Sequence, residues 1–356
     1  MIDAAHKLTR FIEQQYDAKV VKLRPLASSW KQVYRVERPD GPDWVVRLYP
    51  PANGDDSTVA VATQAAILGY LERLAYPAEQ VVRAADGSSV TEHNGRQVLM
   101  TVYLGPSFQP WQPMLGETGL AEAVESVASF DYTPATLQAW GAALAQLHAL
   151  PLEGAPPIAV ADERPGTQLA WASEHLANTA THVPLDLQAE YTYLIQELQT
   201  MDRCEDLPFT MIHGDCGLDN AILLPTNRVA LVDWDWAGLG LAMSDVGWLL
   251  NCCFVKKQLA IEREAIGAVV DGYCQHRSLT AAELDHLPEA IQCHTLKLLA
   301  VFFRKRVEQV LAEDTLIYGA PYAGWRAQYS ASTEIAALAR VYFEQSSSAR
   351  SFISRG

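Results

Sequence analysis

The stretch that most constrains this chain is Met211-Ile-His-Gly-Asp-Cys-Gly-Leu-Asp-Asn220 with the residues that follow it. Two short apolar runs come next, Ala221–Leu224 and Val229–Val232. The intervening Pro225-Thr226-Asn227 has the composition of a tight turn, so the pattern predicts a loop, a strand, a turn and a second strand ending in an acid. Four polar side chains are expected to meet at one end of this hairpin: His213, Asp215, Asn220 and Asp233.

The spacing H-x-D-x-x-x-x-N, followed by a hairpin and an Asp, is that of the kinase catalytic loop. Gly214 stands where protein kinases carry Arg, so the segment resembles the aminoglycoside phosphotransferase and choline kinase family. A carboxylate can accept the proton of a substrate hydroxyl, while an amide oxygen and a second carboxylate can hold magnesium on nucleotide phosphates. We therefore expect Asp215 to be the catalytic base, and Asn220 and Asp233 to be the metal ligands. The alternative is a hairpin whose acids only cap turns.

The resemblance implies an α+β, two-lobed, protein-kinase-like fold, with a small sheet-containing N-terminal lobe and a larger, mostly helical C-terminal lobe. A chain of 356 residues exceeds what one compact core normally holds, which also favours two lobes. We place the nucleotide-binding lobe at 1–104 and the catalytic and substrate-binding lobe at 105–356. Leu144-Ala-Gln-Leu-His-Ala-Leu150 matches a helix of this family, and we interpret His148 within it as structural.

Hydrophobic periodicity and turn residues predict the elements of the first lobe. The expected helices and strands are helices over 2–16 and 55–74, strands over 20–26, 33–37, 44–48 and 97–103, a short strand over 81–83, and a hairpin turn at Asn94-Gly95.

In a kinase-like lobe the first turn, here 27–32, lies over the nucleotide phosphates. It contains no glycine, so Ser28, Ser29 and Lys31 are the candidate phosphate donors. The resemblance places a cation on the third strand, where Arg47 stands, and a guanidinium can grip phosphate oxygens in a bidentate way. The alternative for Arg47 is a surface residue on a strand edge.

The family also places a Glu on the lobe's helix to orient the strand cation. The counterpart by position is Gln64, a neutral amide, with Glu72 two turns later as an alternative. Gln64 supplies no charge, so Arg47 is expected to lack a charged partner and to hold phosphate more loosely. Backbone groups of three residues are expected to meet the adenine edge: Thr101, Val102 and Tyr103.

The second lobe is expected to hold helices at 133–149, 167–180, 185–202, 259–274, 281–287, 291–309 and 331–344, a loop at 318–325 and a frayed tail at 346–356. Asp245 is expected to cap its helix or to anchor the catalytic loop. Asp235 has two interpretations, a second magnesium ligand or a structural residue of its turn, of which we favour the second. Trp171, Glu174 and His175 are candidate substrate contacts, with core or solvent-facing roles as the alternative.

Composition limits the partners. The formal charge of −15 argues against nucleic acid or an anionic membrane surface, and it suits a cationic substrate without requiring one. The six cysteines show neither a disulfide framework nor zinc-ligand spacing, which favours buried free thiols in a reducing cytoplasm. We expect no signal peptide and no membrane span.

These observations predict a cytoplasmic, ATP- and Mg2+-dependent phosphotransferase that moves the γ-phosphoryl group to a hydroxyl of a small molecule. Aminoglycosides, amino alcohols such as choline, homoserine, sugars and macrolides are all acceptors within the family that the sequence resembles. A nucleotide-binding pseudokinase or interaction module is the alternative, favoured by the glycine-free phosphate loop and the neutral Gln64. A protein kinase is a third option. It is disfavoured both by Gly214 in the loop and by the absence of a recognisable Ala-Pro-Glu-type segment after Asp233.

Overall fold

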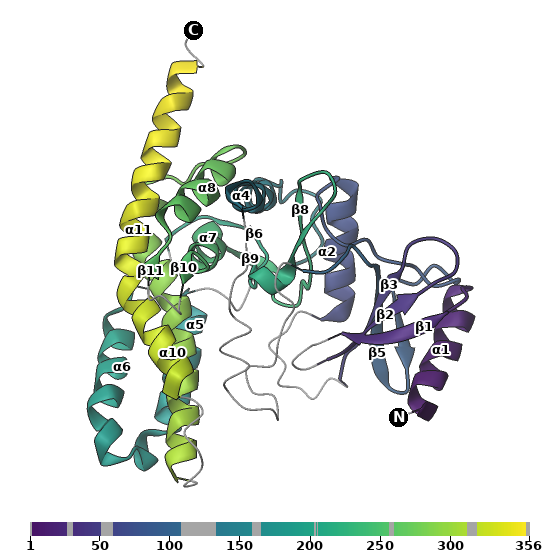
Figure 1. Ribbon diagram of the computed structural model, residues 1–356, viewed down its shortest axis with the longest axis horizontal. Helices are drawn as coiled ribbons and strands as arrows, with labels where there is room; N and C mark the ends of the chain where they lie inside the picture. The colour runs from purple at the N-terminus through teal and green to yellow at the C-terminus, as the bar shows by residue number, and fades with distance from the viewer. Residues whose placement is uncertain are drawn as a thin grey trace. The chain divides into compact units, whose positions relative to one another are not determined.

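A computed structural model of the protein describes residues 2–26, 31–50, 60–107, 133–158, 165–202, 204, 206–255, 260–311 and 319–353. The chain forms two compact units, each assembled from three stretches (Figure 1). Unit 1 comprises Met1–Asp131, Pro151–Ala159 and Leu218–Ala237. Unit 2 comprises Tyr132–Leu150, Val160–Gly217 and Gly238–Gly356.

Unit 1 is built on a five-stranded antiparallel sheet with the strand order β1-β2-β3-β5-β4. The strands are β1 (Lys22–Leu26), β2 (Gln32–Glu37), β3 (Trp44–Leu48), β4 (Val90–His93) and β5 (Arg96–Val102). Asn94 and Gly95 both adopt positive φ, 53° and 73°, which matches the two-residue turn that the Asn-Gly pair predicts. The predicted hairpin and the strand over 44–48 are therefore confirmed.

Alternation along β3 sends Trp44, Val46 and Leu48 to one face of the sheet and Val45 and Arg47 to the other, and all five residues are buried. Trp44, Val46 and Leu48 pack with α1 (Ile2–Tyr16) in one buried hydrophobic cluster, to which Val98 and Met100 of β5 also belong. The residues between them in the sequence point to the other face of the sheet. Because of this alternation, Arg47 and Thr101 share the face away from α1, where the Arg47 guanidinium donates to the Thr101 hydroxyl.

The helix α2 (Val61–Arg73) and a small hairpin complete unit 1. Val61, Ala65, Leu68 and Leu71 are buried, as the predicted helical spacing requires. The residues predicted to cap this helix, at 57 and 58, lie outside the described residues. The hairpin consists of the 3-10 turn η3 (Leu218–Asn220), β7 (Ala221–Leu223) and β8 (Val229–Leu231), and its Leu231 forms a parallel bridge with Ala78. The hairpin predicted from the polar motif is therefore confirmed.

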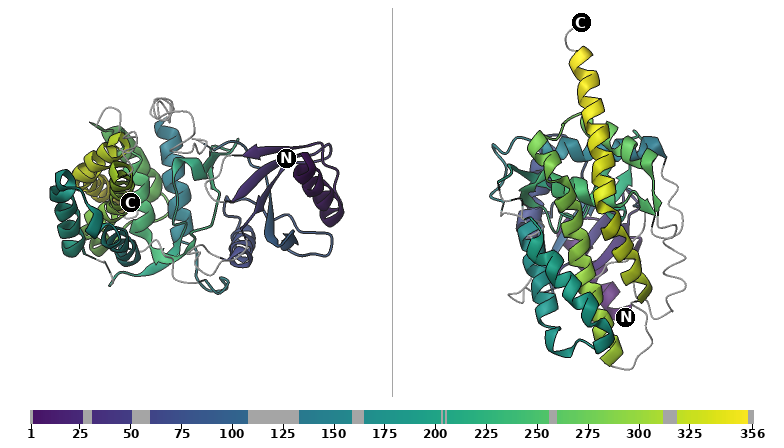
Figure 2. Two further views of the ribbon diagram at one scale, coloured as in Figure 1. Left: turned by 90° about the horizontal axis from the view of Figure 1, so that it is seen from below. Right: turned by 90° about the vertical axis from the view of Figure 1, so that its left-hand side faces the viewer.

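Unit 2 is mostly helical. Its helices are α4 (Pro134–His148), α5 (Pro165–Ala177), α6 (Gln188–Thr200), α7 (Ala242–Asn251), α8 (Arg263–Cys274), α9 (Ala281–Asp285), α10 (Leu287–Leu311) and α11 (Gly319–Ile353), with 3-10 turns η1 (Ala180–His182) and η2 (Leu185–Leu187). Thr133 caps α4 by accepting a hydrogen bond from the Thr136 amide. Figure 2 shows α10 running beside α11, and both contribute to one buried cluster with α5 and α6.

Two short antiparallel pairs lie among these helices: β6 (Phe209–Ile212) with β9 (Gly238–Leu241), and β10 (Phe254–Val255) with β11 (Ala260–Ile261). The β6–β9 pair fixes both ends of the segment that leaves unit 2 for the β7–β8 hairpin. Among the described helices, none combines the length and the apolar character that a membrane span needs.

The prediction of a loop at 318–325 is wrong, because α11 begins at Gly319 and runs to Ile353. Pro321 does not break it, since a proline in the first helical turn removes no intrahelical hydrogen bond. The expected fraying from Ser346 onward is also wrong as far as Ile353. The short strand expected at 81–83 is reduced to a single bridge between Val81 and Thr101.

Candidate active site

The loop that carries Asp215 is held by one buried carboxylate in unit 2. Asp245, in the first turn of α7, accepts hydrogen bonds from the backbone amides of His213, at 2.7 Å, and Gly214, at 2.9 Å. Gly214 adopts φ +79°, a conformation that glycine reaches without steric cost. The expectation that Asp245 anchors this loop is therefore confirmed.

Two buried histidines complete the support of the loop. His213 is fully buried, and its Nδ1 accepts the Asp215 amide at 3.3 Å, which leaves the ring proton on Nε2. His148 of α4 lies with Nε2 3.2 Å from Asp245 Oδ2 and Nδ1 2.9 Å from the Tyr273 hydroxyl. Burial lowers the pKa of His148, although Asp245 opposes this effect. His148 is thus a neutral core residue, as its position in the family-like helix suggested.

Unit 1 holds the two predicted metal ligands at the ends of its small hairpin. Asn220 is buried, and its backbone carbonyl accepts a hydrogen bond from the Val232 amide at 3.0 Å. Asp233 lies two residues beyond the end of β8 and adopts φ +68°, which is uncommon for any residue other than glycine. Its amide donates to Glu79 Oε1 at 3.1 Å. Such backbone outliers persist where surrounding contacts enforce them, and they concentrate at functional sites.

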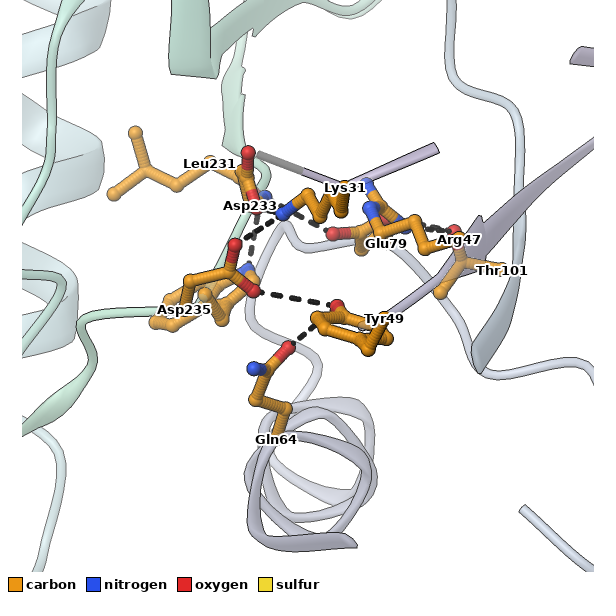
Figure 3. Close-up of polar contacts among 10 residues, drawn as sticks. Lys31, Arg47, Tyr49, Gln64, Glu79, Thr101, Leu231, Asp233 and Asp235 are labelled. Atoms are coloured by element: carbon orange, nitrogen blue, oxygen red, sulfur yellow. Dashed lines mark hydrogen bonds and ion pairs between the residues drawn. The ribbon is translucent and has the colours of Figure 1, made fainter. Parts of the chain in front are cut away.

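Two buried cations lie beside the Asp233 carboxylate (Figure 3). The Lys31 ammonium binds the carboxylates of both Asp233 and Asp235. Arg47 pairs with Glu79, Nη2 to Oε2 at 2.8 Å, and its Nη1 donates to the Thr101 hydroxyl at 2.9 Å. Thr101 in turn donates to Glu79 at 2.7 Å. Glu79 therefore joins the arginine of the sheet to the backbone of Asp233.

The two aspartates of this cluster, Asp233 and Asp235, differ in their pKa. Burial would raise the pKa of Asp233, but the positive charges of Lys31 and Arg47 outweigh burial and lower it. Burial and the neighbouring Asp233 raise the pKa of Asp235 to about 7, against the opposing effect of Lys31. Asp233 is consequently the permanently ionised oxygen donor of the pair.

The prediction that Arg47 lacks a charged partner is wrong. Gln64 does lie on α2, but its Oε1 accepts the Tyr49 hydroxyl at 2.9 Å, and that hydroxyl is also 3.2 Å from Asp235 (Figure 3). The carboxylate comes instead from Glu79, six residues after the end of α2. Sequence reasoning missed Glu79 because it searched the helix, whereas this acid reaches Arg47 from the connection that follows. Glu72, the other candidate, is exposed.

The other predicted nucleotide-binding residues are tested only in part. Ser28 and Ser29 lie outside the described residues. The Val102 amide donates to the Gln80 carbonyl and the Tyr103 amide to the Asp43 carbonyl, both at 2.9 Å, so both donors are engaged within unit 1. Contact of adenine with the carbonyl groups of Thr101, Val102 or Tyr103 stays a prediction.

The candidate acceptor contacts lie on α5 of unit 2. The rings of Trp171 and His175 pack edge to face with centroids 4.0 Å apart, and the Lys297 ammonium lies 5.4 Å from the Trp171 ring centre. Trp171 keeps 39% of its surface exposed. The pair is thus a surface aromatic cluster, and its role toward a substrate stays a prediction.

Each predicted catalytic residue is described within its own unit: Asp215 in unit 2, Asn220 and Asp233 in unit 1. The amide and carboxylate oxygens of Asn220 and Asp233 are the donor types that Mg2+ prefers. The neighbouring guanidinium and ammonium suit a nucleotide's phosphates. The arrangement has the parts that positioning and charge stabilisation of a phosphoryl group require.

The sequence matches the profile of the phosphotransferase enzyme family over residues 22–284. Homoserine kinase of Acidiphilium cryptum (strain JF-5) is 25% identical over 288 residues, which span 79% of this chain and 80% of that protein. The structure resembles amicoumacin kinase in complex with AMP-PNP, Ca2+ and Ami, with a TM-score of 0.62 and 16% identity over 94% of this chain and 95% of the other. It also resembles a microcompartment-associated aminopropanol kinase, with a TM-score of 0.51 and 18% identity over 96% and 98% of the chains.

The α+β architecture is therefore that of the small-molecule kinases with a protein-kinase-like fold. The chain belongs to the phosphotransferase enzyme family, since the family profile covers most of its length. Small-molecule phosphotransfer is the activity that this membership assigns to it, as the sequence predicted.

Proposed function

We propose that the protein transfers the γ-phosphoryl group of ATP to the hydroxyl of a small amino-bearing alcohol, with a hydroxylated amino acid such as homoserine as the first candidate. The acceptor class is supported by the homoserine kinase that aligns over most of both chains, and by the aminopropanol kinase whose fold it shares. Both of those proteins are named for acceptors that carry an amine and a hydroxyl. The net charge of −15 also suits an acceptor with a cationic group.

The observation that carries the nucleotide part of the proposal is the buried cluster around Asp233. Lys31, Arg47 and Glu79 are buried beside the partly exposed Asp233, and a buried group of charges of this kind is costly to maintain without a function. Bound ATP would bring phosphate oxygens for Lys31 and Arg47, and Mg2+ would offset the charge of Asp233. Nucleotide binding is consistent with this donor set, because the amicoumacin kinase that shares the fold was solved in complex with AMP-PNP and Ca2+.

The residues then have distinct tasks. Asn220 and Asp233 would hold Mg2+, which supplies charge neutralisation on the phosphates. Arg47, oriented by Glu79, would grip phosphate oxygens. Asp215 would align the acceptor hydroxyl and accept its proton, while Asp245 and His213 keep the loop in shape.

The pseudokinase alternative loses one of its two supports, because Arg47 has a carboxylate partner in Glu79. Asp215, Asn220 and Asp233 are all present as well. A module that only binds nucleotide remains the outcome to test, and turnover distinguishes it from an enzyme.

The test is a coupled ADP-release assay with ATP, Mg2+ and a panel of L-homoserine, aminopropanol, choline, a hexose, spectinomycin and a macrolide. We expect the highest kcat/KM with an amino-bearing alcohol. The Asp215→Asn variant should lose about 100-fold or more in kcat, because general-base catalysis contributes roughly that much, while its affinity for ATP stays close to that of the wild type. Asp186→Asn, at an exposed position, is the matched control and should keep wild-type turnover.

Unchanged phosphotransfer in Asp215→Asn would refute the assignment of the base. Nucleotide binding without turnover on any acceptor would favour the binding module. Turnover confined to the sugar or the macrolide would overturn the acceptor class and leave the phosphotransferase mechanism standing.

A further inference from the structure

A second group of metal-ligating side chains lies in unit 2, on segments that the proposed reaction does not use. Asp202 and Cys204 belong to the connection between α6 and β6, and His286 lies between α9 and α10. Their ligand atoms all lie within 4.8 Å of one another. His286 Nδ1 is 3.7 Å from Asp202 Oδ2. The chain thus brings a thiol, an imidazole and a carboxylate together across more than eighty residues of sequence.

The backbone fixes Cys204 in this place. Its amide donates to Asp202 Oδ1 at 2.8 Å, and its φ is +53°. Asp202 therefore uses one oxygen to shape the turn and directs the other toward His286. The Cys204 side chain is buried, whereas the Asp202 and His286 side chains keep 55% and 35% of their surface exposed. A metal ion could therefore reach Asp202 and His286 from solvent and bind the buried sulfur of Cys204.

Glu289 is a candidate for a fourth ligand, although the group of ligand atoms within 4.8 Å of one another consists of the other three residues. It lies in the first turn of α10, three residues after His286. Its Oε2 is buried and has no hydrogen-bond partner among the residues that the structure describes. A buried carboxylate oxygen without a donor is costly, and a cation would remove that cost.

The chemistry of this donor set selects one class of metal. Sulfur, imidazole and carboxylate ligands in a four-coordinate arrangement are those of Zn2+, and a thiolate disfavours Mg2+ and Ca2+, which take oxygen ligands. Bond lengths to zinc place neighbouring ligands about 3.5 Å apart. The half-exposed side chains of Asp202 and His286 would need to close by about 1 Å, which rotation about their side-chain bonds provides.

We propose that Cys204, His286 and Asp202 form a structural zinc-class site, with Glu289 as the candidate for the fourth ligand, separate from the Mg2+-nucleotide site. The ion would join the α6–β6 connection to the start of α10. Since β6 leads directly into the loop that carries Asp215, the site would stabilise the entry to that loop without taking part in phosphoryl transfer. Cysteine and histidine spacing along the sequence gives no sign of this site, because its ligands come from segments that only the fold brings together.

The test is a Co2+ titration of the full-length protein, prepared without a polyhistidine tag, stripped of metal and kept in excess Mg2+. We expect a thiolate-to-cobalt charge-transfer band in the near ultraviolet that saturates at about one equivalent and disappears when Zn2+ is added. Cys204→Ser should abolish the band. His286→Gln should lower the affinity about tenfold or more, because even the loss of a supporting residue costs that much at metal sites. Cys252→Ser, at a partly exposed cysteine outside the group, should leave the titration unchanged.

A second readout is thermal. Zn2+ should raise the unfolding midpoint of the wild type and of Cys252→Ser by mass action, and it should have no such effect on Cys204→Ser. If Cys204→Ser does not fold, His286→Gln and Asp202→Asn decide the matter, since both positions are partly exposed. Absence of the band in the wild type, or a band that survives both Cys204→Ser and His286→Gln, would overturn the proposal. Neither readout depends on turnover.

Discussion

At the scale of single residues, Glu79 is the side chain on which the polar cluster of unit 1 depends. One of its oxygens accepts the Asp233 amide, and the other pairs with Arg47 and accepts from Thr101. Arg47 and Glu79 are both almost fully buried, at 7% and 4% exposure. A buried pair of this kind contributes little compared with apolar packing, but removal of one charge leaves the other without compensation.

We therefore expect Glu79→Gln to destabilise the protein by about 3 kcal/mol, as removal of one partner of a buried ion pair typically does. The amide keeps the shape of the side chain, so the loss reports charge and not volume. Urea unfolding measures the change. Glu72→Gln, the same substitution at an exposed position of α2, should stay within about 0.5 kcal/mol of the wild type. Equal effects of the two substitutions would show that Glu79 does not compensate Arg47.

The sequence predicted the candidate base and metal ligands better than it predicted the residues that hold them in place. Asp215, Asn220 and Asp233 stand at fixed separations along the chain, so a spacing rule can find them. The hairpin between them follows from local turn chemistry at Pro225-Thr226-Asn227. Glu79 obeys no such rule, because its partner Arg47 is 32 positions away and the contact depends on how the sheet, α2 and β8 pack.

At the scale of elements, the contact between α4 and α8 depends on two glycines. A Cβ at Gly272 would lie 1.9 Å from the Gln138 carbonyl oxygen, and one at Gly141 would lie 2.1 Å from the Val269 carbonyl oxygen. The backbones of the two helices therefore approach more closely than any side chain allows. The sequence did not reveal this contact, since a glycine inside a helical pattern only lowers helix propensity.

The expected effect of Gly272→Ala is a loss of about 3 kcal/mol, because both backbones are packed and neither can yield cheaply. Gly69→Ala in α2 is the matched control. Nothing lies within 4 Å of a Cβ at Gly69, so the same substitution there should stabilise the protein by about 0.5–1 kcal/mol. Thermal or urea unfolding of the two variants measures both signs. A stabilising Gly272→Ala would mean that the two helices are farther apart than described.

The starts of α4 and α11 show where local sequence patterns predict a helix end correctly and where they do not. The start of α4 is predicted correctly, because Thr133-Pro134 combines a capping side chain with a proline at the first helical position. The start of α11 was missed, because Gly319, Pro321 and Gly324 resemble a loop by composition. Packing decides there: Tyr322, Trp325 and Tyr329 are buried in the cluster with α10, and that burial outweighs weak propensity.

At the scale of the whole molecule, pH acts on stability through His148. Burial lowers its pKa in the folded protein, whereas an unfolded histidine titrates near about 6.5. Below that pH the unfolded state takes up the proton first, so the free energy of unfolding falls as the pH drops. At higher pH His148 is neutral in both states and contributes its full stabilisation.

His148→Gln should therefore be less stable than the wild type near about pH 8, and the difference should shrink toward about pH 5.5. Urea unfolding across that range measures it. His6→Gln, at an exposed site in α1, should follow the wild-type profile throughout. A difference that stays constant or grows at low pH would mean that His148 is protonated in the folded state.

The division of the chain into interleaved stretches has a consequence for its synthesis. Unit 1 draws its last stretch, Leu218–Ala237, from far beyond the first sheet, and that stretch supplies Asp233 to Lys31 and Leu231 to Ala78. Unit 1 cannot finish folding before residue 237 has been synthesised, about two thirds of the way along the 356 residues. A nascent chain stalled earlier should leave the first sheet sensitive to protease, and one stalled well after residue 237 should protect it.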